Sequence, residues 1–493
     1  MPSFFYDRLS FLDNSFLIAE SPTNHMHIAG TATYDAGPLH RPDGGIDVER
    51  IRKYVESRLH LIPRYRQVLA RTPIENHPVW VDDQHFNIDY HVRHTALPRP
   101  GDETQLKALS GRIMAQQLDR SKPLWEMWVV EGLDGGDRFA LITKVHHCMI
   151  DGMSSVDLLE VLLSPMPTDT IDPAPRWVPR PAPDRWDLLW GETRRRIAIP
   201  FDVVRGARSL LGSVRDPRSD LRATARAVRD ALRSTFRQVS DTPLNKPIGP
   251  HRRFDWMRME LSAVKDVKNA LGGTLNDIVL ATVAGAVRRF LETRRVDVDA
   301  GLAFRVMAPV SVRTGEERGT LGNRVSAWMV DLPIGERDPR VRLEKIREAT
   351  AKLKDSKQAL GAELLSRVGE WTPSTLLSLG SRMVTRALPF NLVVTNVPGP
   401  QVPLYLLGAR MLDNFGQVPL TDYLGLGIVL FSYAGLLCWG FNADWDLVPD
   451  LKEFVAATEA SFRELCEAAG ASATDQPVTR PRVLRSVGDV RGV

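Results

Sequence analysis

A buried strand that passes directly into a helix, with two histidines at the junction, places the strongest constraint on how this chain folds. Residues 138–145 are apolar or β-branched enough to predict a buried strand. From residue 153 to 163, apolar residues recur at helical spacing. The turn between them carries His146, His147, Asp151 and Gly152. Turns held by such a scaffold often carry catalytic groups, so we expect a functional site here.

The two histidines are expected to have different roles. Side chains alternate along a strand, so His146 and His147 should point to opposite sides. One is expected to be a general base, because neutral imidazole can take a proton from a hydroxyl near pH 7. Asp151 can fix the turn or pair with a distant arginine, and Gly152 permits an approach that a Cβ would block. The alternative is a buried histidine pair; a metal site is disfavoured because adjacent histidines of a strand diverge.

Several cofactor motifs are missing from the sequence. It contains no GxxxxGK[ST] P-loop, no strand-anchored GxGxxG and no GxSxG nucleophile elbow. The chemistry is therefore expected to need neither ATP hydrolysis nor NAD, and no cofactor is predicted. Among the reaction types that remain, direct attack of an acceptor hydroxyl on an activated acyl group fits the sequence.

The pattern His146-His147-x-x-x-Asp151-Gly152 resembles the HHxxxDG signature of CoA-dependent acyltransferases. Further blocks are similar to one branch, the bacterial wax ester synthase/diacylglycerol acyltransferase family. These blocks are residues 9–27 (with Phe16, Glu20 and His25-Met26-His27), 123–125, 244–253, 276–281 and 396–400. The HHxxxDG pattern alone is specific only to the superfamily, whereas the ordered set covers nearly the whole chain and points to the family.

The resemblance implies a mixed α/β fold with two chloramphenicol-acetyltransferase-like lobes and an active-site channel between them. It implies that His147 takes the proton of the acceptor alcohol as the alcohol attacks the thioester of acyl-CoA, a co-substrate. His146 would position the loop and Gly152 would keep the channel open. Asp151 would orient the structure, for example through Arg313 or Arg324. The donors that stabilise the oxyanion are not identified by the sequence.

Two further motifs are candidates for shaping the substrate channel. They are Pro123, Leu124 and Trp125, together with Asn276 and Asp277. The alternatives are core packing for Trp125 and helix capping for the Asn-Asp pair.

Three functions follow from the resemblance. The first is transfer of a long-chain acyl group to diacylglycerol, giving triacylglycerol, with wax ester synthesis from a fatty alcohol as the close variant. The second, amide-forming condensation, is disfavoured because no carrier-protein or adenylation segment flanks the core. The third is a lipid-binding or scaffolding protein with an inactive acyltransferase core. The intact His147, Asp151 and Gly152 argue against that reading.

Length and composition favour a cytoplasmic enzyme of more than one domain. The chain has 493 residues and 43% hydrophobic content, enough for two or three domains. Its three cysteines have no disulfide-framework spacing, and acidic residues interrupt any signal-peptide core near the N-terminus. We expect an N-terminal lobe over 1–163, a connector over 164–250, a C-terminal lobe over 251–470 and a disordered tail over 471–493.

The connector differs from the rest of the chain in charge. Residues 176–253 contain 18 basic and 8 acidic residues, a net charge of +10 against +4 for the whole chain. Arginines recur at helical spacing at 222, 226, 229, 233 and 237, with an apolar face opposite. Such a helix can lie on an anionic membrane or lipid-droplet surface, and Trp186, Leu189 and Trp190 could anchor it. The alternative is a helix packed on its own protein. Nucleic acid binding is a weaker candidate, since no binding module accompanies the charge.

A charge-free run of 19 residues, 423–441, is long enough to raise a transmembrane helix. It contains four glycines and many β-branched and aromatic residues. We therefore predict two buried strands, at 425–432 and 436–442, with a turn near Tyr433-Ala434-Gly435.

Overall fold

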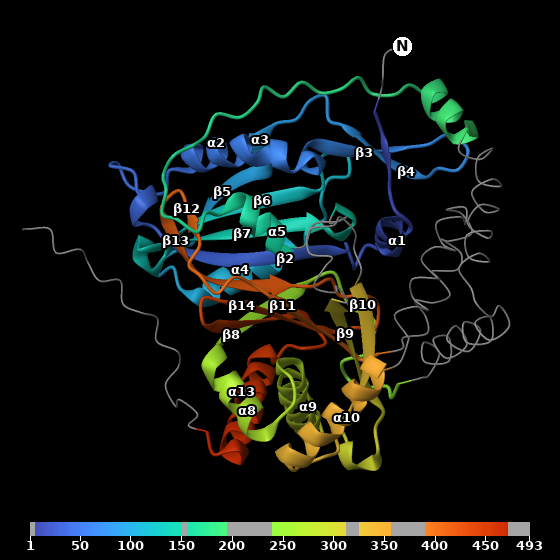
Figure 1. Ribbon diagram of the computed structural model, residues 1–493, viewed down its shortest axis with the longest axis vertical. Helices are drawn as coiled ribbons and strands as arrows, with labels where there is room; N and C mark the ends of the chain where they lie inside the picture. Colours follow the sequence, from blue (N-terminus) through green and yellow to red (C-terminus); the bar gives the residue numbers. More distant parts are fainter. Residues whose placement is uncertain (1–4, 150–154, 195–238, 312–324, 356–389, 472–493) are drawn as a thin grey trace, which may run out of the picture.

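Two six-stranded sheets lie one above the other, with helices on their outer faces and one helix, Glu103–Ala115 (α4), between them (Figure 1). The structure is a computed structural model, which describes residues 5–149, 155–194, 239–311, 325–355 and 390–471. The first sheet has the order β12-β13-β2-β7-β6-β5, and the second the order β10-β9-β11-β14-β15-β8. A small third sheet has the order β1-β4-β3.

The strands of the first sheet are Tyr405–Leu406 (β12), Ala409–Gln417 (β13), His27–Asp35 (β2), Arg138–His146 (β7), Trp125–Leu133 (β6) and Val92–Ala96 (β5). Those of the second are Val325–Leu332 (β10), Phe304–Ser311 (β9), Leu392–Pro398 (β11), Leu426–Tyr433 (β14), Leu436–Asp444 (β15) and Arg252–Glu260 (β8). The third sheet comprises Asp7–Arg8 (β1), Pro78–Asp82 (β4) and Gln67–Arg71 (β3).

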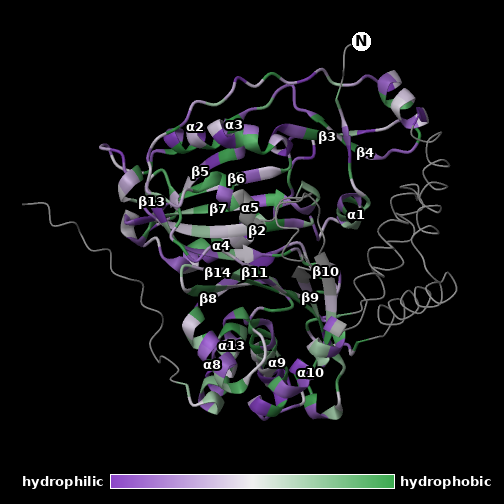
Figure 2. Cartoon of the chain, viewed as in Figure 1, coloured by the Kyte–Doolittle hydropathy of each residue, from purple (hydrophilic) through white to green (hydrophobic). Residues whose placement is uncertain are grey.

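The helices are divided between the two sheets. Those of the N-terminal half are Phe11–Ala19 (α1), Val48–Arg58 (α2), Ile88–His91 (α3), Glu103–Ala115 (α4) and Ser155–Leu162 (α5). Those of the C-terminal half are Leu261–Leu271 (α8), Leu275–Thr293 (α9), Pro339–Asp355 (α10) and Leu451–Ala469 (α13). In Figure 1 the second group lies below the second sheet, while α2 and α3 lie above the first. In Figure 2 helices α8 and α10 carry hydrophilic and hydrophobic residues side by side, as expected for helices with one face in the core.

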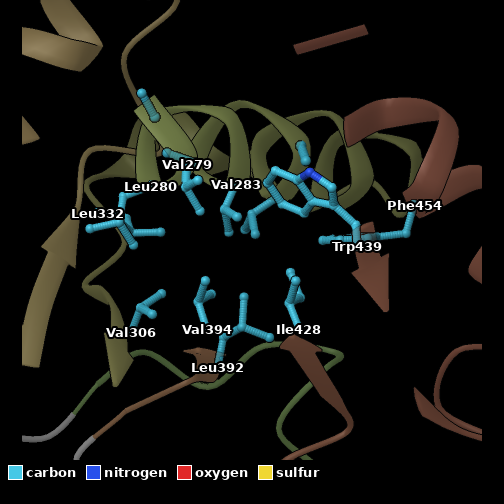
Figure 3. Packing of buried hydrophobic residues seen from close by; sticks show 14 of the residues in the cluster. Val279, Leu280, Val283, Val306, Leu332, Leu392, Val394, Ile428, Trp439 and Phe454 are labelled. Carbon is cyan, nitrogen blue, oxygen red and sulfur yellow. The ribbon is translucent and has the colours of Figure 1, made fainter. Parts of the chain in front are cut away.

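The core of the C-terminal lobe is built around α9. Its first turn is closed by a capping box between Thr274 and Asp277. Beyond the cap the helix is buried almost all round, because α8, α10, α13 and the sheet surround it. Figure 3 shows side chains of α9, among them Val279 and Val283, facing Val394 and Ile428 on the strands. Burial of this apolar surface is the main stabilising contribution in the lobe.

The sheet of the first lobe is completed by chain from the C-terminal half. β13 comes from the C-terminal half, yet it pairs antiparallel with β2 of the first sheet, with Phe415 opposite Thr31. The ring of Phe415 also stacks on Trp256 of β8 in the second sheet, with centroids 4.7 Å apart. The first lobe is therefore not made of residues 1–163 alone, because 405–417 complete its sheet.

The charge-free run forms the predicted hairpin. β14 and β15 pair antiparallel, from Leu426 opposite Ala443 to Tyr433 opposite Leu436. The turn uses Ala434 and Gly435, whose φ angles of 45° and 86° lie in the left-handed region. In the described part of the chain, no single helix is long and apolar enough to cross a bilayer; α8 and α9 pass that test only together, with a bend of 96° between them.

The first part of the connector runs over the N-terminal lobe. The Arg180 guanidinium donates to both oxygens of Asp82, at 2.8 and 2.7 Å. Arg50 pairs with Asp169 on the same stretch, at 3.3 Å. Residues 185–194 then form a helix. The arginine-rich helix predicted near 221–237 and the tail from 472 lie outside the described residues.

Candidate active site

The histidine pair lies at the end of a central strand of the first sheet. β7 ends at His146, and His147 begins a 3-10 turn, His147–Met149. The His146 N–H donates to the Leu124 carbonyl at 3.0 Å, and the His147 N–H donates to the Met26 carbonyl at 2.9 Å. Both neighbouring strands therefore hold the backbone of the turn, as expected for a site that must not move.

The two side chains diverge, as strand alternation predicts. His146 is 1% exposed, and its Nε2 lies 3.5 Å from Glu20 Oε2. Its ring meets that of His27 edge-on, with centroids 6.0 Å apart. His147 is half-buried and stacks on Phe16, with ring centroids 3.9 Å apart and planes at 25°. Only one of the two histidines can therefore serve a given substrate.

Burial sets the protonation state of His147. Removal from water is the largest cause that lowers its pKa, to about 4. The imidazole is therefore neutral at pH 7, as a general base must be before it accepts a proton.

Phe16 and Glu20 are the neighbours of the histidine pair that chemical reasoning from the sequence did not single out. Both belong to α1 or its end, far from His147 in sequence. Their sequence signal was their place in the similar N-terminal block and their spacing of four residues, which puts them on one side of a helix.

The Pro-Leu-Trp motif lies beside the histidines, but its aromatic ring belongs to the core. Trp125 is 2% exposed, stacks on His91 at 4.5 Å and donates from Nε1 to the Tyr65 carbonyl at 2.9 Å. Leu124 supplies the carbonyl that binds the His146 backbone. Leu124 and Trp125 thus hold the end of β7, and a direct contact with substrate stays a prediction for Pro123, Leu124 and Trp125.

Asn276 and Asp277 have separate roles in the fold. The Asp277 carboxylate caps α9 and accepts from the Thr350 hydroxyl at 2.8 Å. Asn276 Oδ1 accepts from Asn396 Nδ2 at 2.6 Å, which joins the start of α9 to the end of β11. Helix capping therefore accounts for Asp277. The hydrogen bond between Asn276 and Asn396 does not show whether Asn276 lines the substrate channel, so that role stays a prediction.

Four further residues with predicted roles, Asp151, Gly152, Arg313 and Arg324, lie outside the described residues, so their roles stay predictions. Within the described ranges, no group of three or more His, Cys, Asp or Glu side chains is arranged to hold a metal.

A small cavity opens between the lobes on the side of His27. Residues 24–27, Met114 and Ala115 line it from the first lobe, and Pro250, Arg252, Pro419 and Leu420 line it from the second half. Its polar groups include His25, His27 and Arg252. The cavity thus lies at the start of β2, the strand that pairs with β7.

Two α/β lobes of this kind, with a histidine at the end of a central strand, define a fold of the chloramphenicol-acetyltransferase type. Among solved structures, the wax ester synthase/diacylglycerol acyltransferase of Marinobacter aquaeolei aligns over 94% of this chain and 100% of its own, with a TM-score of 0.64 and 24% identity. The starter condensation domain of rhizomide synthetase, solved with C8-CoA, aligns over 96% of both chains with a TM-score of 0.54 and 13% identity. These likenesses show the fold.

Sequence comparisons identify the family. The wax ester synthase/diacylglycerol acyltransferase catalytic domain matches residues 9–279, and the C-terminal domain of the same family matches residues 321–466. Two Mycobacterium tuberculosis proteins named as diacylglycerol O-acyltransferases are 34% and 32% identical to this chain, over 96% and 93% of it and 91% and 98% of their own lengths. The chain belongs to the wax ester synthase/diacylglycerol acyltransferase family.

Proposed function

We propose that this chain is an O-acyltransferase that moves a long-chain acyl group from acyl-CoA to the hydroxyl of diacylglycerol, with His147 as the general base. The assignment of the base rests on three features of His147: its protonation state, the orientation of its ring and the position of its backbone. Burial keeps its imidazole neutral, Phe16 fixes its ring, and two neighbouring strands hold its backbone. Such a group can accept a proton at a defined place.

In the proposed reaction His147 removes the hydroxyl proton while the alcohol oxygen attacks the thioester carbonyl. The tetrahedral intermediate collapses, the C–S bond breaks, and the ester is released. The CoA thiolate recovers the proton from the imidazolium of His147. Because burial disfavours this imidazolium, we infer that negative charge developing on the substrate stabilises it in the transition state. The low pKa thus favours rapid return of the proton.

The acceptor assignment rests on the named relatives. The M. tuberculosis proteins are named for diacylglycerol, and the family name includes wax ester synthesis. A fatty alcohol is therefore the alternative acceptor. A condensation reaction draws its support only from likeness of fold, and fold alone does not determine function.

The test is CoA release from palmitoyl-CoA given diacylglycerol, hexadecanol or neither, with the wild-type chain and His147→Ala. We expect acceptor-dependent release that falls by about 10²- to 10⁴-fold in the variant, the usual contribution of general-base catalysis. Acyl-CoA binding and the thermal midpoint should stay near wild type. Near-normal turnover by His147→Ala would contradict the assignment, and release with hexadecanol alone would reverse the order of acceptors.

We also propose that the enzyme works on a lipid surface, at the cytoplasmic face of the membrane or on lipid inclusions. Trp186 and Trp190, one helical turn apart, are 69% and 66% exposed. On the same helix, Leu188 is buried in a cluster with Val79 and Val81. The helix is thus fixed on the protein while two aromatic side chains face outward beside a basic segment. Tryptophan and arginine together favour the interface of an anionic bilayer.

A further inference from the structure

Helix α1 touches both histidines of the site from one side. Phe16 and Glu20 are four residues apart, so they lie next to each other on one side of the chain. Phe16 stacks on His147, and Glu20, the C-cap residue of α1, faces His146. The stacking orients the proposed base directly. The contact with Glu20 calls for another explanation, because His146 points away from the site of reaction.

The hydrogen bonds of His146 determine where its proton lies. Its Nδ1 accepts the N–H of Cys148, at 3.1 Å. A neutral imidazole that accepts at Nδ1 carries its proton on Nε2. That nitrogen lies 3.5 Å from Glu20 Oε2 and has no closer partner among the described residues. The proton of His146 therefore faces a carboxylate, while its lone pair binds the turn that carries His147.

Glu20 is suited to accept that proton. Its side chain is 4% exposed and also contacts Arg120, Gln117 and His25. Burial alone would raise the pKa of Glu20, but the nearby His146 imidazole and hydrogen bonds from Arg120 and Gln117 outweigh it and lower the pKa to about 2. The carboxylate is ionised throughout the neutral range. It thus favours the tautomer of His146 with a proton on Nε2.

We propose that Glu20 is a positioning residue for the acyl transfer: it holds His146 as the Nε2–H tautomer, and His146 Nδ1 then holds the Cys148 backbone and the turn bearing His147. The role rests on the proposed function of His147 as the base. Loss of the carboxylate would let the His146 proton move to Nδ1, where it would oppose the Cys148 N–H. A displacement of the base by about 1 Å can cost about 100-fold in rate.

A simpler role for Glu20 is a structural ion pair with Arg120, which joins the end of α1 to the loop before β6. The two roles predict different effects of removing Glu20 from a protein that already lacks His146. If Glu20 acts through His146, its removal has no further effect once His146 is gone. If it acts through Arg120, the losses from removing Glu20 and His146 multiply.

The experiment compares kcat and KM for Glu20→Ala, His146→Ala and the double variant, with Arg120→Gln as the matched control. We expect Glu20→Ala to lower kcat by about 10- to 100-fold while the KM for acyl-CoA changes little. Glu20→Gln, whose amide oxygen can still face the Nε2 proton, should recover part of the loss. The double variant should be no slower than His146→Ala, and Arg120→Gln should lose much less than Glu20→Ala. Multiplying losses, or equal losses in Arg120→Gln and Glu20→Ala, would overturn the proposal.

A second readout does not depend on turnover. Long-range ¹H–¹⁵N spectra of histidine-labelled protein report which nitrogen of His146 is protonated. We expect the Nε2–H form in the wild type and loss of that preference in Glu20→Ala, with unchanged circular dichroism. An unchanged tautomer in Glu20→Ala would overturn the role of Glu20 even if His147 proves to be the base. Full activity of His147→Ala would overturn the proposed base while leaving the tautomer result intact.

Discussion

Burial in the folded protein lowers the pKa of two histidines, His91 and His147. His91 is 1% exposed and is stacked between Trp125 and Phe86, and its Nδ1 lies 2.8 Å from the Trp125 carbonyl. Removal from water lowers the pKa of His91 to about 4, as it does for His147. Both imidazoles are therefore held neutral by the folded state.

The stability of the protein should fall in mild acid for this reason. The pKa values of His91 and His147 are lower in the folded state than the ordinary value of 6.5, so the unfolded chain binds more protons between pH 6.5 and 4. The stabilisation is complete above pH 6.5 and is lost as the pH falls through that window. Each group contributes a slope of up to about 1.4 kcal/mol per pH unit.

Urea unfolding at a series of pH values between 7.5 and 4.5 measures this slope. His91→Asn, which cannot titrate, should unfold with a shallower pH dependence than the wild type, whatever its stability at pH 7.5. An equal slope in the variant would show that His91 does not titrate on unfolding in this range.

Local patterns in the sequence predicted several elements closely. The strand predicted at 138–145 is β7, Arg138–His146, and the helical spacing at 153–163 corresponds to α5, Ser155–Leu162. The hairpin at 426–444 was predictable because charge-free strands with β-branched residues and a turn of high glycine content leave few alternatives. The residues within and beside a helix or strand largely decide where it begins and ends, so the local sequence is enough to predict these elements.

The helix at 185–194 allows a test of surface binding on a described element. Trp186→Ala with Trp190→Ala should weaken partition onto anionic liposomes, because both side chains are outward-facing and their removal takes away interfacial apolar area. Trp445→Ala is the matched control, since Trp445 is 46% exposed on another part of the molecule, beside Arg253. Co-sedimentation measures the effect.

Equal partition by the double tryptophan variant and the wild type would mean that this helix does not bind the lipid surface and only packs on the protein. Glutamine at positions 226, 229 and 233 extends the same assay to the predicted basic helix outside the described residues, and weaker partition is expected there as well.

At the scale of the whole molecule, the two sheets approach so closely that backbone meets backbone. A Cβ added at Gly440 on β15 would lie 2.1 Å from the carbonyl oxygen of Gly416 on β13. Gly416 belongs to β13, the long strand from the C-terminal half that pairs in the first sheet, and it lies opposite Gly30 of β2. The junction between the lobes therefore requires the absence of a side chain at this point.

Gly440→Ala should destabilise the protein strongly, by about 3 kcal/mol or more, because the atom in the way is backbone and cannot turn aside. Gly37→Ala is the control, since a Cβ there meets nothing within 4 Å. Thermal unfolding compares the two variants. A midpoint for Gly440→Ala close to that of Gly37→Ala would mean that the sheets can separate without cost.

The sequence by itself determined the strand-turn-helix with its diverging histidines, the hairpin and the family. Each of these follows from periodicity or from an ordered set of motifs that can be read along the chain. Only the tertiary structure decided that α1 brings Phe16 and Glu20 to the two histidines and that β13 crosses into the first sheet. Those contacts join segments more than 100 residues apart in the chain. Side-chain packing and strand pairing between distant elements set them, and no local pattern carries that information.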